Sequence, residues 1–374
     1  MEYSWNKFDP KTTTFGSWKK FKELETEAYG RGSVFLACNR SLRCITVKSA
    51  SEHNHYASSW LEQEHGFLSQ LIGIPYVIQC YGEDYSVENG HNVYNLLLEY
   101  APGGTLRDLI KSRYYDQGLS LPETHVAVYA RMLLRGLAGI HGKGIVHCNL
   151  KPETILEFPA IYGGELINDL VIADFASARK VSENHLPVMT TGTTRLYASP
   201  ELVSSGQFGT YTDIWSFGCI VHEMMTGKPF LWNNDIALID QIPQGNNNDN
   251  IDLTSSWRFS NTGEAGVDFL RRCLERDPER RWSAKELLLH PFIIKNLKIM
   301  SETCGVDFEE IDRKNCLRTT ANPFGNGWVS RNLFSEPAMD VEVLQQQRPT
   351  AAHPLLDLLQ QPPQQPRAAA HTGI

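Results

Sequence analysis

Two oppositely charged side chains in the first part of the sequence are placed where they can form a buried ion pair. Lys48 ends a short apolar strand, and residues 59–71 after it have helical periodicity. At 100° per residue, one face of that helix carries Leu61, Glu64, Leu68 and Leu71. A carboxylate on an apolar face needs a partner, so we expect Glu64 to pair with Lys48. The simpler alternatives are a solvent-exposed lysine and a peripheral glutamate.

A second group of polar residues lies near the middle of the chain, in HCNLKPET at 147–154 and DFA at 174–176. Asn149 in the first string carries a neutral amide, which cannot act as a general base at pH 7. The same amide suits a turn, in which it bonds the backbone close to it. Asp174 in the second string offers a carboxylate, the ligand that hard cations prefer.

The elements that must position these groups change type along the chain. The first part consists of short runs broken by Gly, Asn and Asp, as in an antiparallel meander with one helix. The runs expected as strands are FKELETEAY, VFLACN, RCITVKSA, YVIQCYGED and VYNLLLEY. After Pro102 the apolar residues recur with helical spacing. The sequence therefore predicts an α+β fold with a small β lobe, a larger α-helical lobe and a cleft between them.

The composition is that of a folded protein without a basic surface. Of the 374 residues, 41% are hydrophobic, and 35 Lys and Arg against 43 Asp and Glu give a net charge of −8. This balance argues against a nucleic-acid-binding surface and a polybasic membrane anchor. We find no run of about 18 apolar residues and no secretory signal, and the eight cysteines form no C-x-x-C pair. A reduced, soluble intracellular protein with no nucleic-acid or membrane partner is expected.

The density of these patterns divides the chain into regions. The predicted regions are a polar lead at 1–17, one patterned unit at 18–293 with lobes at about 18–101 and about 102–293, an extension at 294–342, and a tail at 343–374. The tail is rich in Gln and Pro and is predicted to be disordered. Within it, HPLLDLLQQ at 353–361 has the alternative of a short partner-binding helix.

Several motifs occur in the order and spacing of the protein-kinase signature set. They are GRGS at 30–33, ITVK ending at Lys48, HCNLKPET, DFA, LYASPEL, TDIWSFG and RDPERRWSAKELLLHPF. On these motifs the chain resembles the serine/threonine protein kinases. The stretches YGEDYSVENG, LLLEYAPGGTL and ERRWSAKELLLHPF resemble the plant mitogen-activated protein kinase kinase kinases most. The resemblance implies a bilobal protein-kinase fold, with one helix in the antiparallel β lobe.

The resemblance also implies an ATP site. Lys48 matches the lysine that contacts the α- and β-phosphates, with Glu64 as its partner. Thr46 stands where the family has alanine and adds bulk at the pocket roof. The residues that match the glycine loop, the adenine pocket and the hinge are Gly30, Gly32, Val34, Thr46, Leu98, Glu99, Ala101 and Leu156.

The glycine loop is shorter than the family pattern. Its valine normally comes seven positions after the first glycine, but Val34 comes four positions after Gly30, so the loop tip and its third glycine are missing. GRGS alone is also typical of an ordinary hairpin turn. The sequence leaves open whether ATP binds.

The catalytic positions implied by the resemblance carry altered residue types. Asn149 replaces the aspartate that accepts the proton of the substrate hydroxyl, and losing such a base costs about 10²–10⁴ in rate. Thr154 replaces an asparagine that binds Mg²⁺, and a hydroxyl is a poorer ligand. Lys151 still matches a residue that meets the γ-phosphate, and Asp174 still matches a Mg²⁺ ligand. ATP and Mg²⁺ are therefore expected to bind weakly.

Two more substitutions affect positions that regulate kinase activity, whereas the residues that stabilise the kinase fold are kept. Cys148 replaces the arginine that pairs with a phosphorylated activation loop, and Ala176 replaces a glycine, which stiffens a hinge because alanine resists positive φ. Glu201 is expected to pair with Arg281, and Asp213 to brace the catalytic-loop backbone. Asp213 has the alternative of a simple acidic residue at a helix N-terminus.

These losses and retentions predict a pseudokinase that acts as a scaffold or allosteric partner in a phosphorylation cascade. Its expected partners are the other kinases or the substrates of a mitogen-activated protein kinase-type cascade. A monomer in the cytoplasm is expected, with the nucleus as a second location. One alternative is a weak serine/threonine kinase in which water or Glu153 replaces the base. Another is a kinase-fold enzyme that uses ATP for different chemistry.

Overall fold

The computed structural model of the chain describes residues 18–26, 32–39, 43–183, 196–230 and 263–318. The chain divides into two units at Trp328, and all described residues belong to the first unit. Several predictions concern residues outside the described part: the lead at 1–17, Gly30, the shortened tip of the glycine loop and the tail at 343–374.

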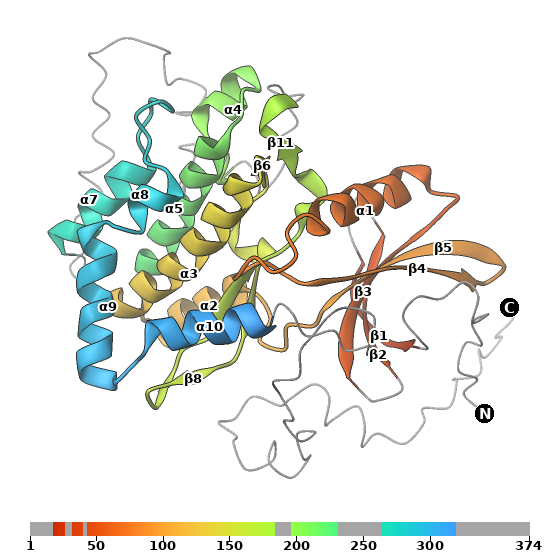
Figure 1. Cartoon of the computed structure of the whole chain (residues 1–374), viewed down its shortest axis with the longest axis horizontal. Coiled ribbons are helices and arrows are strands. Elements are labelled where there is room, and N and C mark those ends of the chain that lie inside the picture. The colour runs from red at the N-terminus through yellow and green to blue at the C-terminus, as the bar shows by residue number, and fades with distance from the viewer. Residues whose placement is uncertain (1–17, 27–31, 40–42, 184–195, 231–262, 319–374) are drawn as a thin grey trace, which may run out of the picture. The chain divides into compact units, whose positions relative to one another are not determined.

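The first lobe is built on a five-stranded antiparallel sheet with strand order β1-β2-β3-β5-β4 (Figure 1). Its strands are β1 (Trp18–Thr26), β2 (Ser33–Asn39), β3 (Cys44–Ser51), β4 (Cys80–Glu88) and β5 (His91–Glu99). The central strand β3 pairs with β2 on one side and with β5 on the other. Ile45 and Val47 are fully buried on one face of β3. Because side chains alternate along a strand, Thr46 and Lys48 lie on the opposite face.

The helix of this lobe, α1 (His55–Leu68), packs against the sheet (Figure 1). It begins at His55 rather than at residue 59, because the Asn54 side chain accepts a hydrogen bond from the backbone N–H of Ala57 and caps the helix. It ends at Leu68 rather than at residue 71, so Leu71 lies beyond the helix, where it is also buried. Leu61, Glu64 and Leu68 are all buried, as predicted from their shared face.

The segment between α1 and β4 differs from the prediction. The strand expected over residues 76–84 begins only at Cys80. Tyr76 has a left-handed φ of 60°, which no strand residue adopts. Val77 forms an isolated bridge with Ile172, so the segment is attached to the second lobe instead of the sheet.

The second lobe is mainly helical, which confirms the predicted bilobal α+β fold. Its helices are α2 (Leu106–Lys111), α3 (Glu123–Gly142), α4 (Pro200–Ser205), α5 (Thr210–Thr226), α7 (Glu264–Cys273), α8 (Ala284–Leu287), α9 (Pro291–Cys304) and α10 (Phe308–Arg318). Three antiparallel strand pairs accompany them: β6 (Ile145–Val146) with β11 (Arg179–Lys180), β7 (Ile155–Phe158) with β10 (Asp169–Ile172), and β8 (Ile161–Tyr162) with β9 (Glu165–Leu166). Helix α5 is buried almost from end to end, so it forms the centre of this lobe.

The predicted boundary at residue 293 falls inside α9, which continues to Cys304. Phe292, Ile293 and Met300 of this helix are buried in the same core as α3. The packed core therefore includes residues of the predicted extension.

The connection between the lobes is held by a close backbone contact with β7. Gly103 donates its N–H to the Glu157 carbonyl at 3.1 Å, and Glu157 donates to the Gly104 carbonyl at 3.0 Å. A Cβ atom on Gly103 would lie 2.7 Å from atoms of Glu157, so this contact requires glycine.

The side chain of Glu157 gives this region a pH dependence. Burial raises its pKa from 4.5 to about 8, although the Asn168 amide donates to it at 2.7 Å. Because the folded pKa is raised, the stabilisation is complete below pH 4.5 and is lost as the pH rises through about 8. We expect the free energy of unfolding to fall by about 3–4 kcal/mol from this group between pH 5 and pH 8.

Glu157→Gln is expected to remove that part of the pH dependence, which urea unfolding at pH 5, 7 and 8 measures directly. The exposed Glu62→Gln is the matched control and should keep the native slope. An unchanged slope in Glu157→Gln would contradict the prediction.

Candidate functional site

The predicted ion pair between β3 and α1 is present and includes a third residue. The Lys48 Nζ donates to both carboxylate oxygens of Glu64 at 2.9 Å and lies 3.5 Å from Oδ1 of Asp174. Glu64 is fully buried. Residues from a strand, a helix and the turn after β10 thus meet at one ammonium group.

Helix α1 is held in this position by further contacts with the segment that follows Asp174. Burial raises the pKa of Glu64, while Lys48 and the backbone N–H of Phe175, which donates at 3.2 Å, favour its charged form. The Gln63 side chain donates to the carbonyls of Ala176 and Ala178 at 3.0 and 3.3 Å. Gln63 was not predicted as a site residue, because its role depends on a segment more than a hundred positions away.

Asn149 makes a contact that its sequence context does not reveal. Its Nδ2 donates to Oδ2 of Asp174 at 3.2 Å, and its backbone N–H donates to Nδ1 of His147 at 3.3 Å. The interpretation of Asn149 as a turn residue that bonds its own backbone is therefore incomplete. The Asn149 amide thus bonds one carboxylate oxygen of Asp174, and the Lys48 ammonium lies near the other oxygen.

The turn that begins at Asp174 explains why Ala176 is tolerated. Asp174 itself has a left-handed φ of 65°, whereas Ala176 lies in the 3-10 turn Phe175–Ser177 and is not among the described residues with positive φ. In this conformation the backbone at position 176 does not need a glycine.

Thr154, predicted at the second cation position, is turned into the backbone of its own loop. Its Oγ1 accepts from the N–H of Lys151 at 3.2 Å and lies 3.0 Å and 3.2 Å from the carbonyls of Lys151 and Asn149. The side chain is almost fully buried. These contacts stabilise the loop, and the hydrogen bond from Lys151 occupies one of the two lone pairs of the hydroxyl.

Asp213 at the start of α5 braces this loop, as predicted. Its carboxylate accepts from the backbone N–H groups of His147 and Cys148 at 2.8 and 3.0 Å. Cys148 has a left-handed φ of 62°, so these bonds hold a strained backbone in place. The His141 Nε2 lies 2.9 Å from the same carboxylate.

The residues predicted for the adenine pocket and hinge lie around the junction of the lobes. Thr46 pairs directly with Leu98 across β3 and β5, and Leu156 packs against the core that contains Leu98. The backbone N–H of Glu99 donates to the Gln79 carbonyl at 2.9 Å. Ala101 is half-buried in the connection that follows β5.

Two glycine-loop positions are described, and both lie near Lys48. Val34 is the cross-strand partner of Lys48. Gly32 has a φ of 110°, and a Cβ there would lie 2.4 Å from the carbonyl oxygen of Ser49. This close approach requires glycine whether or not the loop covers a nucleotide.

Comparison with known proteins decides the family. The family described as "Protein kinase domain" matches residues 29–293. The chain belongs to the protein kinase family. It is 35% identical to mitogen-activated protein kinase kinase kinase 20 of Arabidopsis thaliana, over 85% of this chain and 91% of the relative. It is also 35% identical to mitogen-activated protein kinase kinase kinase 17 of the same plant, over 71% and 67%. The yeast serine/threonine-protein kinase BCK1/SLK1/SSP31 is 31% identical over 74% of this chain and 18% of the relative.

Protein kinases generally use ATP and Mg²⁺. In this chain the residue that would contact the phosphates is better suited to its role than the residues that would bind the cation. Lys48 is oriented by Glu64 as a phosphate-binding lysine must be. Of the two predicted cation ligands, Asp174 presents a carboxylate, whereas the Thr154 hydroxyl is buried and hydrogen-bonded within its own loop. The residues therefore fit a phosphate contact and one carboxylate ligand for a cation, with a buried hydroxyl at the second ligand position.

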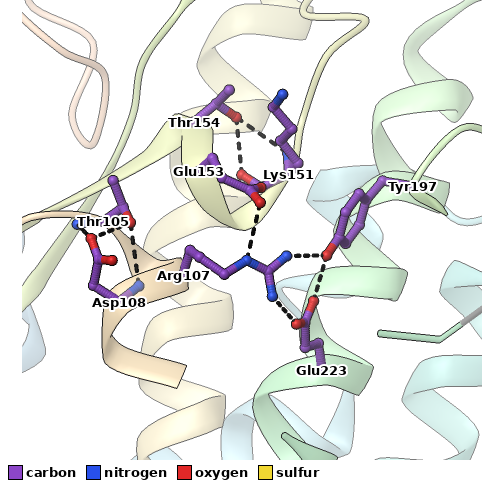
Figure 2. A network of polar contacts seen from close by, with 8 residues as sticks. All are labelled: Thr105, Arg107, Asp108, Lys151, Glu153, Thr154, Tyr197 and Glu223. Carbon is purple, nitrogen blue, oxygen red and sulfur yellow. Dashed lines mark hydrogen bonds and ion pairs between the residues drawn. The ribbon is translucent and has the colours of Figure 1, made fainter. Parts of the chain in front are cut away.

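The kinase catalytic loop is tied to α2 and α5 by a polar network that the motifs do not predict (Figure 2). Arg107 of α2 donates its Nε to Glu153 at 3.0 Å, and its two other nitrogens bond Glu223 and the hydroxyl of Tyr197. Tyr197 also donates to Glu223 at 2.6 Å. One carboxylate oxygen of Glu153 is thus engaged in an ion pair with Arg107. This arrangement disfavours Glu153 as a substitute base.

The predicted ion pair between Glu201 and Arg281 anchors the end of the kinase activation segment. Arg281 donates to the two carboxylate oxygens at 2.8 and 3.2 Å, and its side chain is completely buried. It also donates to the carbonyls of Tyr211 and Glu275 at 2.8 and 2.9 Å. The four threonines Thr190, Thr191, Thr193 and Thr194, where activation-segment phosphorylation usually falls, lie outside the described residues.

Within the part of the chain that the structure describes, no helix is both long and apolar enough to cross a membrane.

Proposed function

We propose that this chain is a pseudokinase of the mitogen-activated protein kinase kinase kinase type, which binds other members of a phosphorylation cascade as a scaffold or allosteric partner. The observation that carries the proposal is the hydrogen bond from the Asn149 amide to Asp174. At the position where a kinase holds a general base, this chain holds a donor that is bonded to the cation ligand.

The retained parts of the fold support a binding function. The Lys48–Glu64 pair, the Asp213 brace and the Glu201–Arg281 anchor hold α1, the catalytic loop and the end of the activation segment in place. These contacts stabilise a kinase-shaped surface without depending on turnover. The partners that we propose are kinases or substrates of the same cascade, with the protein acting as a monomer in the cytoplasm.

A phosphotransfer assay with labelled ATP tests the proposal. We expect the native chain to transfer no more phosphate to a general protein substrate than Lys48→Met does. Lys48→Arg is the matched control. Arginine keeps a positive charge beside Glu64, whereas methionine removes it, so the comparison separates the loss of the lysine from the loss of the ion pair. Turnover by the native chain that Lys48→Met abolishes would overturn the proposal.

The second candidate, a weak serine/threonine kinase, rests on the intact contact between Lys48, Glu64 and Asp174. It predicts that Asn149→Asp raises phosphotransfer by about 10²–10⁴, the usual contribution of a general base. A thermal shift with ATP, measured with and without Mg²⁺, is the companion experiment. If ATP gives no shift in either condition, this candidate and the use of ATP for different chemistry both fail, and only the binding function remains.

A further inference from the structure

Helix α10 lies beyond the residues that match the kinase family, yet it is part of the packed core. The family match ends at residue 293, and α10 begins at Phe308. Val306 and Ile311 are almost completely buried in the cluster that also contains α3. Figure 1 shows α10 alongside α3, and the Arg131 guanidinium of α3 lies 5.6 Å from the ring of Phe308.

The carboxylate of Asp312 on α10 is the centre of a buried polar cluster. It accepts a hydrogen bond from the Tyr76 hydroxyl at 2.6 Å and from Nη1 of Arg131 at 2.8 Å. The Nε of Arg135 forms an ion pair with it at 3.1 Å. A short phenol–carboxylate bond in a buried site is charge-assisted and strong, and burial together with Asp312 raises the pKa of Tyr76, which keeps the phenol a donor.

A second residue of α10 bonds the backbone at the same place. Asn315 is almost completely buried, and its Oδ1 accepts from the backbone N–H of Tyr76 at 2.8 Å. Its Nδ2 lies 3.4 Å from Oδ2 of Asp169, the first residue of β10. Helix α10 thus holds Tyr76 by both its main chain and its side chain.

Tyr76 lies in the segment between α1 and β4, and it attaches this segment to β10, the strand that leads to Asp174. Its carbonyl accepts from Ile172 at 2.9 Å, and Ile78 donates to the Ile172 carbonyl at 2.9 Å. Asp174 follows Ile172 by two residues. The left-handed φ of Tyr76 is unfavourable for a bulky residue, so surrounding contacts must hold it.

We propose that α10 is a C-terminal latch in which Asp312 and Asn315 are positioning residues for the α1–β4 segment. By holding Tyr76, the latch fixes the segment that follows α1 against β10, and so keeps Glu64 of α1 beside Lys48 and Asp174. Residues of α10, which lie beyond the region that matches the protein kinase family, thereby control the arrangement of Glu64, Lys48 and Asp174. This inference is independent of whether the chain transfers phosphate.

Hydrogen–deuterium exchange of the full chain tests the latch. Asp312→Asn removes the charge and keeps the shape, and we expect exchange in residues 69–79 and in α1 to rise by about 10–100-fold. Exchange in α7 of the second lobe reports global unfolding and should change little. Glu310→Gln is the matched control on the same helix, because Glu310 forms only an exposed pair with Lys314. Faster exchange confined to α10, or raised equally in α7, would overturn the proposal.

Tyr76→Phe keeps the test informative if Asp312→Asn folds poorly. It removes only the phenol hydroxyl and should raise exchange in the same segment, by a smaller factor. In the double variant, which carries Tyr76→Phe and Asp312→Asn, we expect exchange to rise by less than the product of the factors for the two single variants. Both substitutions act through the same hydrogen bond. Fully multiplicative effects would show that Tyr76 and Asp312 act separately and would contradict the latch.

Discussion

Replacing Asn149 with aspartate is expected to destabilise the chain by about 3–5 kcal/mol at pH 8 without divalent cations. The substitution exchanges the amide donor, 3.2 Å from Oδ2 of Asp174, for a second carboxylate. Two unit charges at such a distance repel by about 5 kcal/mol at an effective dielectric constant of 20. Partial exposure of Asp174 reduces the repulsion, whereas the lost charge-assisted hydrogen bond adds to the destabilisation.

The same variant is expected to gain a response to Mg²⁺ that the native chain lacks. Two facing carboxylates form a better site for a hard cation than a carboxylate and an amide donor. Saturating Mg²⁺ should restore about 2–3 kcal/mol, the effect of a ligand at about 100 times its Kd. Urea unfolding with and without Mg²⁺ measures both effects.

Asn149→Ala is the matched control for this experiment. It removes the hydrogen bond but adds no charge, so it should lose stability without gaining a response to Mg²⁺. If the native chain responds to Mg²⁺ as strongly as Asn149→Asp does, the contact between Asn149 and Asp174 does not weaken cation binding. The proposed reason for impaired catalysis would then be wrong.

Replacing Glu201 with alanine is expected to cost about 3–5 kcal/mol, the usual effect of leaving one partner of a buried ion pair without its counter-charge. The Arg281 side chain has no solvent exposure, so water cannot compensate for the missing carboxylate. The two remaining carbonyl partners of Arg281 bond its protons without neutralising its charge. Urea unfolding of the full chain measures the loss.

An exposed pair provides the control for this second prediction. Glu302 lies 3.7 Å from Lys298, and both side chains are largely exposed, so Glu302→Ala should cost less than about 1 kcal/mol. Replacing Glu201 and Arg281 together by methionine should cost less than Glu201→Ala alone, because no buried charge remains. A loss for Glu201→Ala no larger than that for Glu302→Ala would contradict the structural role of the pair.

Several features of the fold and site could be predicted because they depend on short-range patterns. Helical periodicity placed Glu64 on the apolar face of α1, where a carboxylate needs a partner, and the kinase resemblance implied that this partner is Lys48. The contact of Glu201 with Arg281, and that of Asp213 with the catalytic loop, followed from the kinase resemblance. Each of these residues lies in a motif that can be read without knowing the rest of the chain.

Other features depend on which segments meet, and the sequence pattern carries no signal for them. Arg107 lies in a short helix of ordinary composition, and only folding brings it to Glu153 and Glu223. Tyr76 looks like the first residue of a strand, but Asp312, 236 positions away, bonds its hydroxyl and helps to hold it outside the sheet. The substitution of Asn149 was visible in the sequence, whereas its bond to Asp174 was not.

The sequence by itself determined the kinase fold, the two lobes and the residue types at the catalytic positions, because local periodicity and motif spacing are properties of the chain. Only the tertiary structure decided how those residues are used. It directs the Asn149 amide to Asp174, engages Glu153 with Arg107, and packs α10 against Tyr76. The physical reason is that a buried polar group must find a partner, and the partner is chosen by packing between distant segments.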